Sequence, residues 1–146
     1  MISGACRCGS VTYRLAGEKL PAVYACHCLD CQTWSGSAFA EHALMPEDAI
    51  AVDGTTTVYR HGGEEGGSEQ VVCETCFTRI YNRNSAVPGM VVLRAGTLAA
   101  SDRIAPVAHI WTMRKQPWLV IPDDVPTWPG TPSPQEFFEA TQKQSD

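Results

Sequence analysis

Residues 26–31, Cys26-His27-Cys28-Leu29-Asp30-Cys31, form the densest of three cysteine clusters in this chain. The other two are Cys6-Arg7-Cys8 and Cys73-Glu74-Thr75-Cys76, so the clusters together contain all seven cysteines. A closed structural zinc site usually takes four thiolates, whereas a site with three protein ligands keeps one position for water or substrate. Seven clustered cysteines therefore predict one four-ligand site and one three-ligand site.

Disulfides and iron–sulfur clusters are the alternatives to zinc. A disulfide between Cys6 and Cys8 would close a very small ring, and pairing seven cysteines leaves one over. Residues 1–5 lack the basic and apolar regions of a secretion signal, so we expect a reducing, cytoplasmic location. Iron–sulfur clusters also use thiolates, but closely spaced cysteines in groups separated by long stretches of chain are more typical of zinc sites. An iron–sulfur cluster therefore remains an alternative to zinc at this point.

Spacing also ranks the ways in which the cysteines can share ions. Cys26, Cys28 and Cys31 are close enough in sequence to surround one ion by themselves. The two remaining clusters can each supply half of a tetrahedron, and joining them closes a long loop of chain. Such a site contributes its metal affinity to folding, on the order of 10 kcal/mol in small zinc modules. We therefore expect a structural site formed by Cys6, Cys8, Cys73 and Cys76.

A zinc ion with three thiolates has a formal charge of about −1, which makes it a poor Lewis acid. Such a centre is suited to holding an incoming thiol as its thiolate, because coordination lowers the thiol pKa. The alternative is that His27, an aspartate or a water fills the fourth position permanently. In an extended segment the His27 side chain points away from Cys26 and Cys28, so we expect it to pack beside the site.

Composition favours one soluble globular domain. The chain has 146 residues, 44% hydrophobic content, a formal charge of −5 and a pI near 5.3. An acidic chain lacks the basic face that nucleic-acid binding requires, so we expect no nucleic-acid partner. Apolar runs such as residues 90–93 are far shorter than the roughly 20 residues of a membrane helix, so we expect no membrane partner.

Most of the chain is expected to form short strands, because apolar and polar residues alternate over short runs bounded by turn residues. The expected strands are residues 10–15, 23–26, 37–42, 56–60, 69–72, 79–82, 90–95 and 109–111. The glycine-rich segment 62–67 predicts a turn, because the Lys-Ser/Thr of a phosphate-binding loop does not follow it.

The C-terminal region predicts an extended tail and one helix. Ser133, Pro134 and Glu136 form a helix-start signal before an apolar run. Six prolines between residues 117 and 134 favour an extended surface path without regular hydrogen bonding. We expect Trp111, Trp118 and Trp128 to pin this tail to the core as large apolar anchors.

With these motifs in order, the chain resembles the glutathione-dependent formaldehyde-activating enzyme family, which includes the centromere protein V domain. The resemblance rests on the three cysteine clusters with their neighbours, Gly4 to Val11, Cys26 to Phe39 and Cys73 to Cys76, and on later landmarks. The landmarks are Gly96-Thr97-Leu98, Pro106, His109-Ile110-Trp111, Pro117-Trp118-Leu119 and Asp123-Asp124. We therefore expect a zinc-binding domain over residues 1–130 and a helical tail over residues 131–146.

The resemblance implies a mainly β fold, a β-tent of several small coiled antiparallel sheets stapled by zinc, with a short C-terminal helix. It implies a structural zinc at Cys6, Cys8, Cys73 and Cys76. A catalytic zinc is implied at Cys26, Cys28 and Cys31.

The implied activity is that of a carbon–sulfur lyase acting on thiol–aldehyde adducts, such as S-(hydroxymethyl)glutathione formed from glutathione and formaldehyde. The partners would be a small thiol and an aldehyde or related electrophile. His27 and His109 are candidates for the acid that protonates the product oxygen, although water would suffice. The alternative is a non-catalytic, zinc-stabilised β module for protein interaction, because the family includes members used in that way.

Four residues depart from the family pattern. Phe77 stands where a glycine commonly follows the last cysteine, which predicts a strained or different turn. Gln70 stands where an arginine often precedes that cluster. Gln32 and Thr33 follow Cys31 where basic residues are frequent, which weakens the expected recognition of glutathione's two carboxylates.

Overall fold

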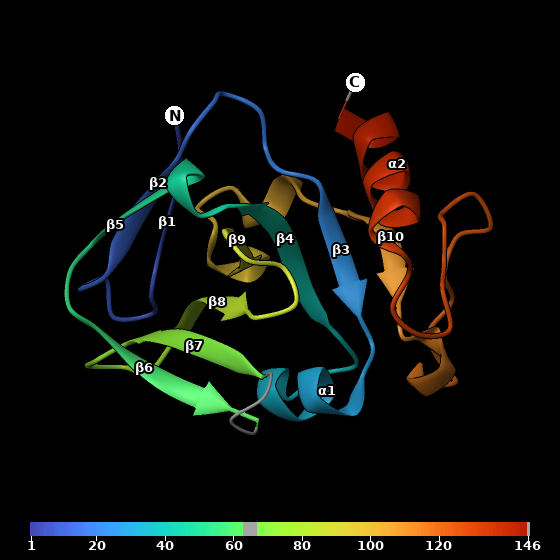
Figure 1. Ribbon diagram of the computed structural model, residues 1–146, viewed down its shortest axis with the longest axis horizontal. Helices are drawn as coiled ribbons and strands as arrows, with labels where there is room; N and C mark the ends of the chain where they lie inside the picture. Colours follow the sequence, from blue (N-terminus) through green and yellow to red (C-terminus); the bar gives the residue numbers. More distant parts are fainter. Residues whose placement is uncertain (63–66, 146) are drawn as a thin grey trace. The chain divides into compact units, whose positions relative to one another are not determined.

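The computed structural model describes residues 1–62 and 67–145 and shows a mainly β protein with a C-terminal helix (Figure 1). This confirms the predicted fold class. Residues 63–66 lie outside the described residues, and with them most of the turn predicted over 62–67. Among the described residues, no helix is both long and apolar enough to cross a bilayer.

The chain divides into two compact units, each built from two segments. Unit 1 comprises residues 1–20 and 43–103, and unit 2 comprises residues 21–42 and 104–146. The separate expectation of a domain boundary near residue 130 stays a prediction.

Unit 1 contains two sets of antiparallel strands. The first set pairs in the order β1-β2-β5, from β1 (Ile2–Ala5), β2 (Thr12–Leu15) and β5 (Ile50–Asp53). The second pairs in the order β9-β8-β7-β6, from β6 (Thr56–His61), β7 (Ser68–Cys73), β8 (Arg79–Asn84) and β9 (Met90–Arg94). Short 3-10 turns lie at Glu47–Ala49, Ala95–Thr97 and Ser101–Arg103.

Close packing in unit 1 explains the glycine two residues before the first cysteine cluster. A Cβ at Gly4 would lie 2.2 Å from the hydroxyl of Tyr13, so only glycine lets β1 lie this close to that side chain. The Tyr13 ring is 1% exposed, and its hydroxyl hydrogen-bonds the Thr97 hydroxyl at 2.8 Å. This packing positions the strand that leads into Cys6.

Unit 2 carries β3 (Val23–Cys26), which pairs in parallel with β10 (Pro106–Ile110) and antiparallel with the start of β4 (Ala40–Pro46). The helix α1 (Leu29–Ser35) follows β3 directly, and a 3-10 turn, Thr112–Arg114, follows β10. The helix α2 (Pro134–Ser145) packs against β3 through the rings of Phe137 and Tyr24, whose centroids are 4.7 Å apart.

The start of α2 confirms the predicted cap. The backbone N–H of Glu136 donates to the Ser133 hydroxyl at 3.2 Å, and that hydroxyl donates to the Glu136 carboxylate at 2.9 Å. The first bond satisfies a free N–H of the first turn, and the second, from the Ser133 hydroxyl, is the main cause that lowers the pKa of the Glu136 carboxyl.

The proline-rich tail differs from the expectation in two respects. It does form backbone hydrogen bonds, because the N–H groups of His109 and Trp111 donate to the carbonyls of Pro126 and Gly130. Proline lacks a donor but keeps its carbonyl, so a proline-rich strand can still accept along one edge. The role predicted for Trp118 is wrong, since 68% of that side chain is exposed.

Candidate metal centres

Four cysteines of unit 1 converge at the start of the chain and the end of β7. Cys6 and Cys8 follow β1, while Cys73 ends β7 and Cys76 lies in the turn beyond it. Their four sulfurs lie within 4.8 Å of one another, with Cys8 at 3.6 Å from Cys6 and 3.8 Å from Cys73. Thiolates at 2.3 Å from a tetrahedral zinc lie about 3.8 Å apart, so the spacing of this four-cysteine cluster fits that ion.

Hydrogen-bond donors surround the four-cysteine cluster. The Ser10 hydroxyl lies 3.0 Å from the sulfur of Cys8 and 3.3 Å from that of Cys73. The Thr78 hydroxyl lies 3.0 Å from the Cys76 sulfur and, as the main cause, lowers the pKa of that thiol to about 5. These contacts favour thiolates, the form in which cysteine binds metal.

Phe77 completes the turn beside this cluster in the left-handed region, with φ of 61°. Its backbone N–H donates to the Cys73 carbonyl at 3.0 Å, and 68% of its side chain is exposed. The turn therefore keeps the conformation for which glycine is usual although the residue is not glycine, as its departure from the family pattern predicted.

Three cysteines of unit 2 form the second group. Cys26 ends β3, Cys28 is the N-cap of α1, and Cys31 lies on the buried face of that helix. Their sulfurs lie within 4.8 Å of one another. The backbone N–H of Cys31 donates to the Cys28 sulfur at 3.4 Å, so Cys28 serves both the helix cap and this three-cysteine cluster.

The surroundings of the three-cysteine cluster are mostly apolar. Cys26 and Cys31 are buried with Ala40, and Ile110 and Trp111 pack against them. Cys28 is half-buried, whereas Cys26 and Cys31 are buried, so Cys28 is the least buried member of the cluster.

The titration of these thiols reflects their crowding. The neighbouring thiols of Cys28 and Cys31, followed by burial, raise the pKa of Cys26. Hydrogen bonds from Cys26 and then Cys31 lower the pKa of Cys28. Three crowded sulfurs cannot all ionise without a cation to balance them, so the donor set suits a divalent metal ion.

The two histidines weighed as acids lie together in unit 2, outside the sulfur group. The His27 Nε2 lies 2.8 Å from the His109 Nδ1, and both rings are buried near Phe39. Burial, followed by the charges of His109 and Lys115, lowers the pKa of His27 to about 4. Burial also lowers the pKa of His109, so both rings are neutral near pH 7.

His42 is a neighbour of the site that the sequence did not indicate. Its Nε2 lies 3.9 Å from the Cys31 sulfur, and its ring packs edge-on against Tyr24 at 5.3 Å. The position of His42 follows from the strand register, in which Ala40 pairs with Cys26 and His42 pairs with Tyr24. Only the β3–β4 pairing brings His42 beside the cysteines.

These features define a mainly β protein with two thiol clusters that can each hold a metal ion. The chain belongs to the glutathione-dependent formaldehyde-activating enzyme family, whose match covers residues 1–114.

Among solved structures, a crystal structure of a Rhodobacter sphaeroides protein is similar to this chain, with a TM-score of 0.54 and 19% identity. The similarity covers 86% of this chain and 98% of that protein, and at this identity it supports the fold alone. No curated protein matches the chain.

Proposed function

We propose that this protein is a zinc-dependent enzyme of the carbon–sulfur lyase type that forms or cleaves thiol–aldehyde adducts. An example is S-(hydroxymethyl)glutathione, formed from glutathione and formaldehyde. The observation that carries the proposal is the three-cysteine cluster, which is one thiol short of a closed zinc site and has Cys28 half-exposed. The family match supports the same chemistry.

Cys26, Cys28 and Cys31 would hold the catalytic zinc. When bound there, zinc would favour the thiolate form of an incoming thiol. The packing of Ile110 and Trp111 keeps water from the buried side of the cluster. Substrate therefore approaches from the side of Cys28.

The reaction needs little from acid–base side chains. The thiolate sulfur adds to the carbonyl carbon, a carbon–sulfur bond forms, and the π electron pair moves to the oxygen, which takes a proton. His27 and His109 are neutral, buried and hydrogen-bonded to each other, so water is the proton donor in this proposal. The reverse sequence cleaves the adduct.

The four-cysteine cluster would hold a second, structural zinc that links the start of the chain to the end of β7. Its sulfurs already number four, so it has no position for a substrate. We propose a cytoplasmic location, where thiols stay reduced.

Exchange spectroscopy with ¹³C-formaldehyde tests the proposal. The rate of exchange between formaldehyde hydrate and its thiol adduct is measured with and without the zinc-loaded protein, using several small thiols. We expect acceleration by the wild-type protein and its loss in Cys28→Ser. Elemental analysis should give two zinc ions per chain and no iron. Exchange at the uncatalysed rate with every thiol tried would overturn the enzymatic proposal.

The second candidate is a non-catalytic, zinc-stabilised β module for protein interaction. The exposed apolar side chains of Met113, Trp118 and Val120 in unit 2 favour it. The two candidates differ in whether the metal at the three-cysteine cluster responds to added thiols.

A further inference from the structure

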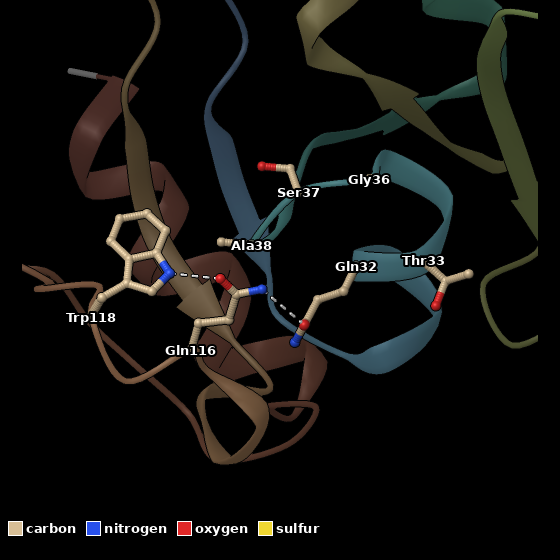
Figure 2. A pocket seen from close by; sticks show the side chains of 7 residues that line it. All are labelled: Gln32, Thr33, Gly36, Ser37, Ala38, Gln116 and Trp118. Carbon is tan, nitrogen blue, oxygen red and sulfur yellow. Dashed lines mark hydrogen bonds between the residues drawn. The ribbon is translucent and has the colours of Figure 1, made fainter.

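An open pocket lies beside α1 in unit 2 (Figure 2). Its volume is about 500 Å³, within the range of small-molecule sites. The lining residues come from α1, the segment after it and the segment following β10: Gln32, Thr33, Gly36, Ser37, Ala38, Gln116 and Trp118. None of these seven side chains is ionisable, so the lining is polar but uncharged.

A chain of hydrogen bonds holds three of the lining side chains in place (Figure 2). The Trp118 indole N–H donates to the Gln116 side-chain oxygen at 2.6 Å, and the Gln116 amide donates to the Gln32 side-chain oxygen at 3.4 Å. The Gln32 amide donates in turn to the carbonyls of His27 and Arg114, at 2.8 and 2.9 Å. The indole is thus fixed at its polar edge while 68% of the side chain stays exposed.

The pocket is joined to the three-cysteine cluster through the same turn of helix. Gln32 follows Cys31 in α1, and its amide holds the carbonyl of His27, which lies between Cys26 and Cys28. The Cys31 N–H donates to the sulfur of the half-buried Cys28. The backbone N–H of Gln32 donates to the Cys28 carbonyl at 3.0 Å, so this lining residue lies one helical turn from Cys28.

The uncharged lining selects against charged ligands. A carboxylate that loses its water here would meet amides and hydroxyls, and desolvating an unpaired charge is costly. The Lys115 ammonium does not line the pocket and donates instead to the carbonyls of Gln116 and Leu119. Gln32 and Thr33, the two residues after Cys31, bring no positive charge to the lining. The Trp118 ring offers a flat apolar face. The second N–H of the Gln116 amide and the second lone pair of each glutamine oxygen can still bond a ligand's amide.

We propose that this pocket binds the non-sulfur part of the thiol substrate, and that this part is uncharged, carries amide groups and presents a flat or apolar face to Trp118. The inference rests on the proposed function and specifies its substrate class. Glutathione, with two carboxylates, is a poor fit to this lining.

The test uses the full chain with cobalt in its metal sites and follows the cobalt absorption spectrum during thiol titrations. The probes are N-succinylcysteamine, its terminal carboxamide, and glutathione. The first two differ in charge far from the sulfur, so their thiols have closely similar acidity. We expect the carboxamide to bind at least about tenfold more tightly than the carboxylate, and more tightly than glutathione.

Two variants localise the preference to the pocket. Trp118→Ala should weaken carboxamide binding about three- to tenfold. The matched control is Phe138→Ala, which removes another exposed aromatic ring of unit 2 that does not line the pocket, and it should bind like wild type. Thr33→Arg, at an exposed position, should reverse the preference toward the carboxylate probe.

Failure of this inference is distinguishable from failure of the proposed function. A cobalt spectrum that no thiol alters would overturn both. A spectrum that responds to thiols, with the carboxylate probe or glutathione bound as tightly as the carboxamide, would overturn the pocket inference alone. An equal effect of Trp118→Ala and Phe138→Ala would do the same.

Discussion

The two cysteine clusters have similar sulfur spacing but different surroundings. In unit 1, four sulfurs accept hydrogen bonds from hydroxyls and backbone N–H groups, as from Ser10 and Thr78. In unit 2, the three sulfurs lie against apolar side chains such as Ile110, with a backbone N–H on Cys28 and the His42 ring near Cys31 as polar neighbours. The first cluster has the four thiols of a closed metal site, whereas the second has three. On this difference in thiol number and neighbours we base the proposed structural role of the first cluster and the proposed chemical role of the second.

The largest expected effect is on folding, from removal of a ligand in the four-cysteine cluster. Cys73 is fully buried at the end of β7, so Cys73→Ser would replace one of the four proposed thiolate ligands by a weaker hydroxyl ligand. We expect unit 1 to lose most of the zinc contribution, on the order of 10 kcal/mol. Circular dichroism melting and zinc analysis measure this. A variant that keeps both zinc ions and melts like wild type would contradict the structural role.

The matched change in the other cluster should affect the metal more than the fold. Cys28 is half-exposed, and serine at this N-cap can still accept the backbone N–H of Cys31. We therefore expect Cys28→Ser to lose thiol response at this site while the four-cysteine cluster keeps its zinc. Zinc analysis and backbone NMR check this. Loss of chemical-shift dispersion throughout unit 1 in Cys28→Ser would contradict the expectation that the two clusters contribute differently to folding.

Alkaline pH should weaken unit 1 through its core tyrosine. Burial raises the pKa of Tyr13 from 10 to about 12, so the folded state keeps a proton that the unfolded state loses. Its contribution is complete below pH 10 and decreases as pH rises toward 12. We expect unfolding free energy to fall by about 1 kcal/mol between pH 9 and 11, relative to Tyr13→Phe. Identical pH profiles for the two proteins in urea unfolding would show that Tyr13 ionises freely.

The smallest effect concerns the two non-glycine residues that have positive φ in the described part of the chain, one in each unit. Phe77 and Trp111 have φ of 61° and 59°. Phe77 is exposed, so Phe77→Gly should relieve backbone strain and stabilise the protein by about 0.5–1 kcal/mol. Trp111 packs against the three-cysteine cluster, and its indole N–H donates to the Thr131 hydroxyl. Trp111→Gly should therefore destabilise the protein. Urea unfolding of both variants tests this difference in sign.

Cysteine spacing predicted much of the site because ligands two or three residues apart must lie close together whatever the surrounding fold. The structure brings the seven cysteines into the two expected groups. The strand entering Cys26 was also predictable, since β-branched and aromatic residues precede it. The helix α1 was missed because its seven residues are too short for clear periodicity and its N-cap is a cysteine.

Features that depend on distant pairing were not accessible from sequence. The parallel pairing of β3 with β10 joins segments about 80 residues apart, and it places His109 against His27. The contact between His42 and Cys31 needs the register of β3 with β4. Trp118 was assigned to the core from its size, but its indole is held at the surface by Gln116.

X-ray absorption at the zinc edge tests the central difference between the clusters most directly. The zinc-loaded protein is measured alone and with a saturating small thiol, and the mean number of sulfur neighbours is compared. We predict about 3.5 sulfurs per zinc without thiol, rising to about 4 when the three-cysteine cluster accepts the added thiolate. A sulfur number that thiols leave unchanged would contradict an open site at Cys26, Cys28 and Cys31.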